Sequence, residues 1–145
     1  MMTEDKNIAR FLDVYQKLRA DNLQTLKTIY RDDIKFVDPA HSIAGIDAVM
    51  EYFSVLYNNV NNISFTFEPS LVNGSSGYVR WLMNFSHGRL AAGKSISVEG
   101  VTFLQFDEEG KVYFHRDYFD LGAMLYEHLP LLGRIVSSIK RRLGK

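Results

Sequence analysis

The chain has 145 residues, of which 46% are hydrophobic and 13% aromatic, and this is enough apolar material for one domain with its own core. The 17 basic and 17 acidic residues balance, which excludes a global charge argument for binding nucleic acid or an acidic partner. No cysteine is present, so disulfides, thiolate nucleophiles and thiolate metal sites are excluded as well.

The chain opens with the charged segment MMTEDKNIAR, which leads into no apolar signal region. No later segment approaches the roughly 18 consecutive apolar residues of a membrane span. No internal repeat or linker divides the sequence. We therefore expect a soluble, cytoplasmic protein that forms a single domain over residues 1–145.

Three segments in the first part of the chain have apolar residues at spacings of three and four, which predicts helices with one buried face. The second of them starts where Asp21 and Gln24 resemble a capping box. A brief strand, ended by Pro39, separates it from the third. The three apolar faces consist of Ile8, Phe11, Leu12, Tyr15 and Leu18; of Leu23, Leu26, Ile29 and Tyr30; and of Ile46, Val49, Met50, Phe53, Leu56 and Tyr57.

From Ile63 onward the period of the apolar residues changes to two, which predicts strands. Turn sequences such as NGSSG and DEEG separate the apolar runs, so we expect a four-strand antiparallel meander. Gly100 lies inside one strand and predicts a bulge or bend, as a strongly curved sheet would need. The pattern predicts an α+β domain, with three N-terminal helices packed on one face of a curved sheet.

A helical segment is expected over residues 121–145, within the same domain. After Pro130 has interrupted the preceding helix, apolar residues fall on one face and basic residues on the opposite face. Two interpretations stay open: a lid over a pocket, and a helix that lies on an anionic membrane surface. The lid is favoured, because five charges on one short helix give only weak membrane affinity.

The stretch VYFHRDYFDLG, residues 112–122, sets aspartates and a histidine among aromatic residues on a predicted strand. If the strand alternates, His115 and Asp117 share one face. A buried carboxylate is costly unless it is hydrogen-bonded, so Asp117 is either a general base in an apolar pocket or a structural group satisfied by Arg80 or His115. Asp120, just before LGAMLYEHL, is most simply a helix N-cap.

Asp38 is a second candidate base, although an Asp–Pro pair that ends a strand is also ordinary turn chemistry. The four histidines show no metal-ligand spacing, so we expect neither a metal nor a cofactor. The sequence leaves open which face each residue of the strand 78–86 occupies. The residues expected to line a pocket between helices and sheet are Tyr15, Tyr30, Phe53, Tyr57, Trp81, Thr102 and Phe103.

The order of these elements, the segment YRDDIKFVDP…GIDAVMEYF and the ending FDEEGKV…RDYFD resemble the nuclear transport factor 2-like superfamily over nearly the whole chain. Within it, the sequence is similar to the SnoaL-like, limonene-epoxide-hydrolase-like and ketosteroid-isomerase-like branches. The resemblance implies a cone-shaped α+β barrel. Isomerases, cyclases, hydrolases and non-catalytic binding domains share this scaffold, so the fold alone does not name the reaction.

Ketosteroid isomerases of this superfamily use an aspartate at the position of Asp38 as the general base. They also use a tyrosine and a protonated aspartate as an oxyanion hole. Ungapped alignment places Val14 at the tyrosine, with Tyr15 one residue away, and Thr102 at the aspartate. The resemblance therefore implies that the base is kept and the oxyanion hole is lost, which disfavours steroid isomerisation.

Limonene epoxide hydrolases share the ending RDYFDL, in which the first aspartate helps to activate water, and this implies such a role for Asp117. Their earlier arginine–aspartate motif matches only at Arg80, because Leu82 stands at the position of the second acid. Opening an epoxide needs an acid as well as a base, so that reaction is disfavoured. SnoaL-type polyketide cyclases need mainly one aspartate base in an apolar cavity. The resemblance implies that Asp117 can serve as this base.

The leading hypothesis is a small, cofactor-independent enzyme that abstracts a proton or activates water on a hydrophobic small molecule. Asp117 is the expected base, with Arg80 and His115 as its neighbours and Asp38 as the second candidate. The alternative is a non-catalytic module that binds a lipid-like ligand or a partner protein in the same cavity. Three helices can cover only one face of the sheet, so we also expect a homodimer through the other face.

Overall fold

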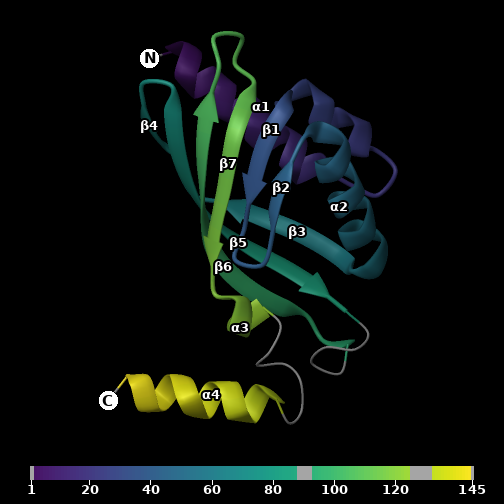
Figure 1. The fold of residues 1–145 in the computed structure, drawn as a ribbon, viewed down its shortest axis with the longest axis vertical. Helices are drawn as coiled ribbons and strands as arrows, with labels where there is room; N and C mark the ends of the chain where they lie inside the picture. The colour runs from purple at the N-terminus through teal and green to yellow at the C-terminus, as the bar shows by residue number, and fades with distance from the viewer. Residues whose placement is uncertain (1, 88–92, 125–131, 145) are drawn as a thin grey trace.

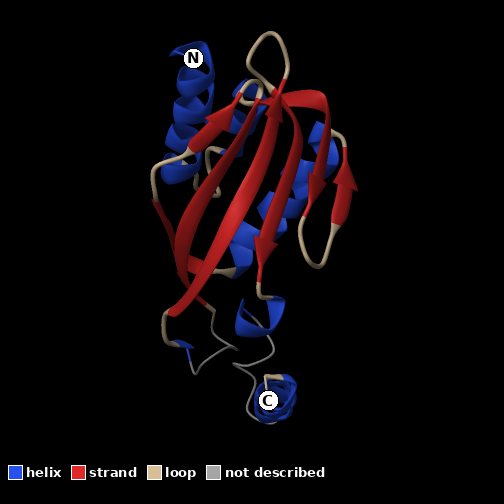
Figure 2. Ribbon diagram, turned by 90° about the vertical axis from the view of Figure 1, so that its left-hand side faces the viewer, coloured by secondary structure: helices blue, strands red, loops and turns tan. Residues whose placement is uncertain are grey.

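A computed structural model describes residues 2–87, 93–124 and 132–144, and shows a strongly curved sheet with the N-terminal helices on one side and the C-terminal helices beyond its lower end (Figure 1). In the view turned by 90°, the described helices leave the other face of the sheet uncovered (Figure 2). The helices are α1 (Met2–Lys17), the 3₁₀ helix η1 (Leu23–Thr28), α2 (Ile46–Asn59), α3 (Leu121–Met124) and α4 (Leu132–Leu143). The strands are β1 (Tyr30–Val37), β2 (Ser42–Ala44), β3 (Asn61–Phe67), β4 (Leu71–Asn73), β5 (Ser76–Ser86), β6 (Ile96–Phe106) and β7 (Val112–Phe119).

The sheet has seven strands in the order β2-β1-β7-β6-β5-β3, with β4 paired to β5 off this path. The α+β class and the cone-like curvature are confirmed, but the sheet is open, with β2 and β3 at its ends. The expected four-strand meander is present and antiparallel. It is extended by β1, which pairs parallel with β7 and makes the sheet mixed.

The first and third predicted helices are confirmed as α1 and α2. The second is a 3₁₀ helix of six residues rather than an α-helix, and the predicted capping box is wrong. Asn22 is the N-cap residue, and its side chain closes the end of α1 by accepting from the Arg19 N–H and donating to the Lys17 carbonyl. The helix ends at Thr28, so Tyr30 begins β1.

Of the two alternatives expected at Gly100, the bulge is wrong, because the β5–β6 register runs without a shift through the pair of Gly100 and Trp81. The bend stays a prediction. The glycine is required for a different reason. A Cβ at this position would lie 2.3 Å from the Trp81 ring, so the missing side chain lets the indole lie flat across β6.

The C-terminal part is helical, as predicted, in α3 and α4. Residues 125–131, including Pro130, lie outside the described residues. The α3 helix begins directly after Asp120, whose carboxylate accepts a hydrogen bond from Lys140 of α4. Within the described residues, no helix is long and apolar enough to cross a membrane. The role of this segment as a lid or a membrane contact stays a prediction.

Candidate functional site

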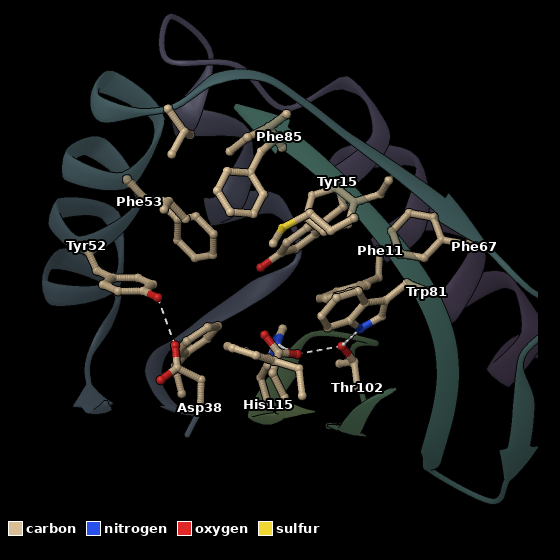
Figure 3. A pocket seen from close by; sticks show the side chains of 18 of the residues that line it. Phe11, Tyr15, Asp38, Tyr52, Phe53, Phe67, Trp81, Phe85, Thr102 and His115 are labelled. Atoms are coloured by element: carbon tan, nitrogen blue, oxygen red, sulfur yellow. Dashed lines mark hydrogen bonds and ion pairs between the residues drawn. The ribbon is translucent and has the colours of Figure 1, made fainter. Parts of the chain in front are cut away.

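A cavity of about 390 Å³ lies between the helices and the inner face of the sheet (Figure 3). Its wall is built from α1, α2 and five strands, and ten of its side chains are aromatic. These are Phe11, Tyr15, Phe36, Tyr52, Phe53, Phe65, Phe67, Trp81, Phe85 and Phe119. The remaining polar side chains in the wall are Asp38, His87, Thr102, His115 and Asp117. The lining residues include two carboxylates and no lysine or arginine.

The structure brings most of the predicted site residues to this cavity. The alternation of β7 is as expected, with His115, Asp117 and Phe119 on the inner face. The predicted residues that line the cavity are Asp38, His115, Asp117, Tyr15, Phe53, Trp81 and Thr102. Sequence reasoning missed Tyr52, although its spacing of three from Val49 and four from Leu56 places it beside the buried face of α2.

Arg80 was expected beside Asp117, and this prediction is wrong. Because side chains alternate along β5, the inward position of Trp81 turns Arg80 to the outer face. There its side chain is 69% exposed and forms an ion pair with Glu68 at 3.1 Å. Asp117 therefore has no contact with this guanidinium, and its hydrogen-bond partners among the described residues are Thr102 and His115.

Three of the expected pocket residues do not line the cavity. Phe103 lies on the outer face of the sheet, with its ring centroid 4.9 Å from that of Tyr78. Tyr57 packs behind Phe53, and its hydroxyl is buried with no partner among the described residues. Tyr30 is fully buried behind the cavity wall and contributes only through its hydrogen bonds.

Asp117 is held by donors from neighbouring side chains. Its Oδ1 atom lies 2.5 Å from the hydroxyl of Thr102 and 2.7 Å from Nε2 of His115. The Trp81 indole N–H donates to Thr102 Oγ1 at 2.8 Å, so the threonine hydroxyl must give its own proton to Asp117 (Figure 3). No described residue donates to Oδ2 of Asp117.

The hydrogen-bonded chain continues on the other side of His115. Its Nδ1 atom lies 2.7 Å from the Tyr30 hydroxyl, which in turn lies 2.6 Å from the hydroxyl of Tyr15. His115 is 1% exposed and packs against Phe36, with ring centroids 4.5 Å apart and the rings tilted by 36°. The Tyr15 hydroxyl points into the cavity (Figure 3). One continuous network thus reaches the cavity at both Asp117 and Tyr15.

Asp38 is held differently, although it lines the same cavity. Its Oδ1 accepts from the backbone N–H groups of Ala40 at 2.8 Å and His41 at 2.7 Å, and lies 3.1 Å from the His41 ring. Its Oδ2 accepts from the Tyr52 hydroxyl at 2.8 Å. Both oxygens are therefore occupied. Asp38 joins the β1–β2 turn to α2, as the turn interpretation predicted.

Burial sets the protonation of the tyrosines around these carboxylates. Removal from water raises the pKa of Tyr15 and of Tyr30 well above the ordinary value, and the nearby Asp117 charge adds to the effect for both. Burial, followed by the charge of Asp38, also raises the pKa of Tyr52. The three phenols therefore stay protonated at neutral pH and serve as hydrogen-bond donors rather than as bases.

The family model of the SnoaL-like domain matches residues 8–115 of the chain, a segment that ends two residues before Asp117. A search of the curated proteins finds no match to the sequence.

Solved structures with the same fold are numerous, at sequence identities that show the fold alone. A SnoaL-like polyketide cyclase candidate from Jannaschia sp. CCS1 is 16% identical, with a TM-score of 0.73 over 83% of this chain and 90% of that one. A protein with a ketosteroid isomerase-like fold from Catenulispora acidiphila DSM 44928, crystallised with trimethylamine, is 16% identical, with a TM-score of 0.72 over 86% and 93%. An epoxide hydrolase from M. tuberculosis that is like the limonene enzymes is 16% identical, with a TM-score of 0.67 over 85% and 82%.

Proposed function

The chain belongs to the SnoaL-like domain family, and from this premise we propose that it is a cofactor-independent enzyme that performs acid–base chemistry on a hydrophobic small molecule. The aromatic cavity holds the substrate, and Asp117 is the general base. The reaction is a proton abstraction or a water activation, of the isomerase, cyclase or hydrolase type.

The observation that carries the proposal is the unequal occupation of the two oxygens of Asp117. Thr102 and His115 fix Oδ1, while no described residue donates to Oδ2. A carboxylate that is oriented through one oxygen and open at the other is suited to take a proton from a bound molecule. Asp38 lacks this property, because both of its oxygens accept hydrogen bonds from the protein.

The geometry favours the single-base chemistry of polyketide cyclases over epoxide hydrolysis. Arg80, which the hydrolase motif would place beside the aspartate, lies on the outer face. No lysine or arginine in the described wall is available to stabilise an opening epoxide oxygen. A substrate that carries its own acidic C–H group needs only the base and an apolar surrounding.

A non-catalytic binding module remains the second candidate. The observation in its favour is that most polar side chains of the wall are already paired within the protein. Thr102, Trp81 and Tyr52 each use their proton in an internal hydrogen bond. Such a cavity binds an apolar ligand through its aromatic wall without any reaction.

Hydrogen–deuterium exchange separates the two candidates before the substrate is known. Apolar ketones are incubated with the protein in D₂O, and deuterium at the carbon beside the carbonyl is measured by mass spectrometry. We expect the wild-type protein to catalyse the exchange and Asp117→Asn to lose it, while Asp33→Asn, at an exposed position on β1, retains it. Exchange that persists in Asp117→Asn contradicts the proposed base. Tight binding of ketones without exchange favours the binding module.

The uncovered face of the sheet supports the proposal of a homodimer. Tyr78 and Tyr118 are each 49% exposed, and Leu71 is 74% exposed. Phe103 and Phe114 contact each other on the same face. A patch of this kind on a small domain is typical of an interface.

Light scattering of the wild type should show a dimer at micromolar concentration, and Tyr118→Glu should shift it to the monomer. A monomeric wild type contradicts the proposal.

A further inference from the structure

The network from Asp117 to Tyr15 has both of its ends on the cavity wall, and one of its links, Tyr30, lies behind the wall. The links are Asp117 to His115, His115 to Tyr30, and Tyr30 to Tyr15, at 2.7, 2.7 and 2.6 Å between the bonded atoms. Tyr30 is fully buried and does not line the cavity. It can affect a bound ligand only through its neighbours.

Counting protons fixes the direction of every link while Asp117 is ionised and the imidazole is neutral. The carboxylate can only accept, so Nε2 of His115 carries the proton and Nδ1 must accept from Tyr30. The single proton of Tyr30 is then used, so Tyr15 must donate to Tyr30. In this state Tyr15 presents only an oxygen lone pair to the cavity.

One additional proton on Asp117 permits the reverse direction. The proton must lie on the oxygen that faces Nε2, so a carboxyl group protonated on its open oxygen first rotates about its Cβ–Cγ bond. Asp117 then donates to Nε2, Nδ1–H donates to Tyr30, Tyr30 donates to Tyr15, and the proton of Tyr15 is directed into the cavity. His115 changes from the Nε2–H to the Nδ1–H tautomer. Every group other than Asp117 holds the same number of protons as before, so the reversal separates no charge.

We propose that Tyr15 is the second ligand contact of this site, and that the protonation state of Asp117 decides, through His115 and Tyr30, whether Tyr15 accepts or donates a hydrogen bond. The inference rests on the proposed function, because it requires a ligand in the cavity. When Asp117 takes a proton from a ligand carbon, the ligand oxygen gains negative charge, and Tyr15 becomes able to donate to that oxygen. His115 and Tyr30 are positioning residues in this scheme.

The surroundings are consistent with such a relay. No lysine or arginine in the described wall supplies a fixed positive charge to the network. Burial raises the pKa of both phenols in the network, so they stay protonated and carry the reversal without forming phenolates. The titratable groups that surround Asp117 on the packed elements are His115 on β7, Tyr15 on α1, Tyr30 on β1, Asp38 after β1, Tyr52 on α2 and His87 after β5.

Proton uptake on ligand binding tests the relay. The probe is 2-acetonaphthone, a ketone that can only accept, and its control is 2-isopropylnaphthalene, which has the same shape without the oxygen. Calorimetry in buffers with different ionisation enthalpies gives the number of protons taken up per bound probe. In the wild type at neutral pH we expect close to one proton for the ketone, with affinity falling about tenfold per pH unit, and none for the control.

Two variants break the relay at different points. In Tyr30→Phe, Tyr15 is free to donate to the ketone, so we expect binding without proton uptake. Asp117→Asn can take up no proton at this position, and its amide oxygen still accepts from His115, so Tyr15 stays an acceptor. We expect its affinity for the ketone to fall to that for 2-isopropylnaphthalene, without proton uptake. Neither substitution changes the shape of the cavity. The affinity of both variants for 2-isopropylnaphthalene should therefore stay within about twofold of the wild type. Tyr15→Phe replaces Tyr30→Phe if the latter does not fold.

Nitrogen NMR of His115 supplies an independent readout. The ketone should move this ring from the Nε2–H to the Nδ1–H tautomer in the wild type but not in Tyr30→Phe. Two N–H groups on His115, ketone binding without proton uptake, or uptake that survives Tyr30→Phe would each overturn the relay and leave the proposed function standing. Failure of both naphthalenes to bind would count against the proposed function itself, and the relay would fall with it.

Discussion

Two carboxylates face the same cavity, and the donors that hold them differ in kind and in number. Asp38 is bound by the backbone of the next few residues and by Tyr52 of α2. Asp117 is bound by side chains of its own strand and of β6. The backbone donors hold Asp38 in a turn, whereas the side-chain donors orient Asp117 through Oδ1, and no described residue donates to its Oδ2. The proposed distinction between a structural Asp38 and a reactive Asp117 therefore rests on the source and number of their donors.

Asp117→Asn should give the largest effect, and it acts on the reaction rather than on stability. The amide oxygen of asparagine can still accept from Thr102 and His115, but the basic lone pair is gone. We expect proton abstraction to fall by roughly 10² to 10⁴-fold, while the free energy of unfolding changes by less than about 1 kcal/mol. Exchange rates and urea denaturation measure the two quantities. A stability loss of about 3 to 5 kcal/mol would show instead that Asp117 belongs to a structural charged pair.

Asp38→Ala should produce the opposite pattern. The substitution leaves the Ala40 and His41 N–H groups and the Tyr52 hydroxyl without their acceptor. We expect the free energy of unfolding to fall by about 2 to 4 kcal/mol, because several donors lose their partner in a half-buried turn. Urea denaturation measures it, with Asp33→Ala on the exposed side of β1 as the control. A neutral result would remove the contrast between the two carboxylates.

Gly100→Ala tests the support of Asp117 without touching that of Asp38. The new methyl group would lie 2.3 Å from the Trp81 ring, so the indole has to move away from Thr102. We expect a loss of about 1 to 3 kcal/mol from overpacking. Tryptophan fluorescence should change as well, because the indole loses its hydrogen bond. Unchanged fluorescence together with unchanged stability would mean that the Trp81 ring can make room for the methyl group and keep its hydrogen bond to Thr102.

Alkaline pH should destabilise the protein, because the buried tyrosines hydrogen-bonded to Asp38 or within the Asp117 network would have to ionise. Burial raises the folded-state pKa of Tyr15, Tyr30 and Tyr52, so their contribution to stability is complete below the unfolded value of about 10. The contribution is lost as the pH rises above it, by up to roughly 1.4 kcal/mol per pH unit for each phenol. Denaturation across this range, with Tyr15→Phe as a variant of shallower slope, measures the effect. Tyrosinate absorbance that appears before unfolding would contradict it.

The inward-facing side chains of β7 were predicted correctly, whereas those of β5 were predicted only in part. His115, Asp117 and Phe119 alternate with Arg116 and Tyr118, and the resemblance to the superfamily placed Asp117 on the inward face. In β5 the residues Arg80 and Trp81 are adjacent, and only the packing of the indole on Gly100 settles which one points inward.

The remaining errors come from contacts between distant segments. The strands β2 and β4 have three residues each, too few to show a period. The parallel pairing of β1 with β7 leaves no local signal, because its partners lie far apart in the sequence. For the same reason Tyr30 was predicted on a helix face of the pocket, although it is the central link of the network behind the wall.

The pairing of β1 with β7 also affects how the protein is made. The hydrogen bond between Tyr30 and His115 joins residues 85 positions apart, and closing so large a loop is slow because it costs much chain entropy. Until β7 has left the ribosome, β1 and β6 each expose an unpaired strand edge that can join another chain. The last strand among the described residues therefore completes the sheet and brings Asp117 to the cavity at the same time, so a chain that ends before β7 lacks both.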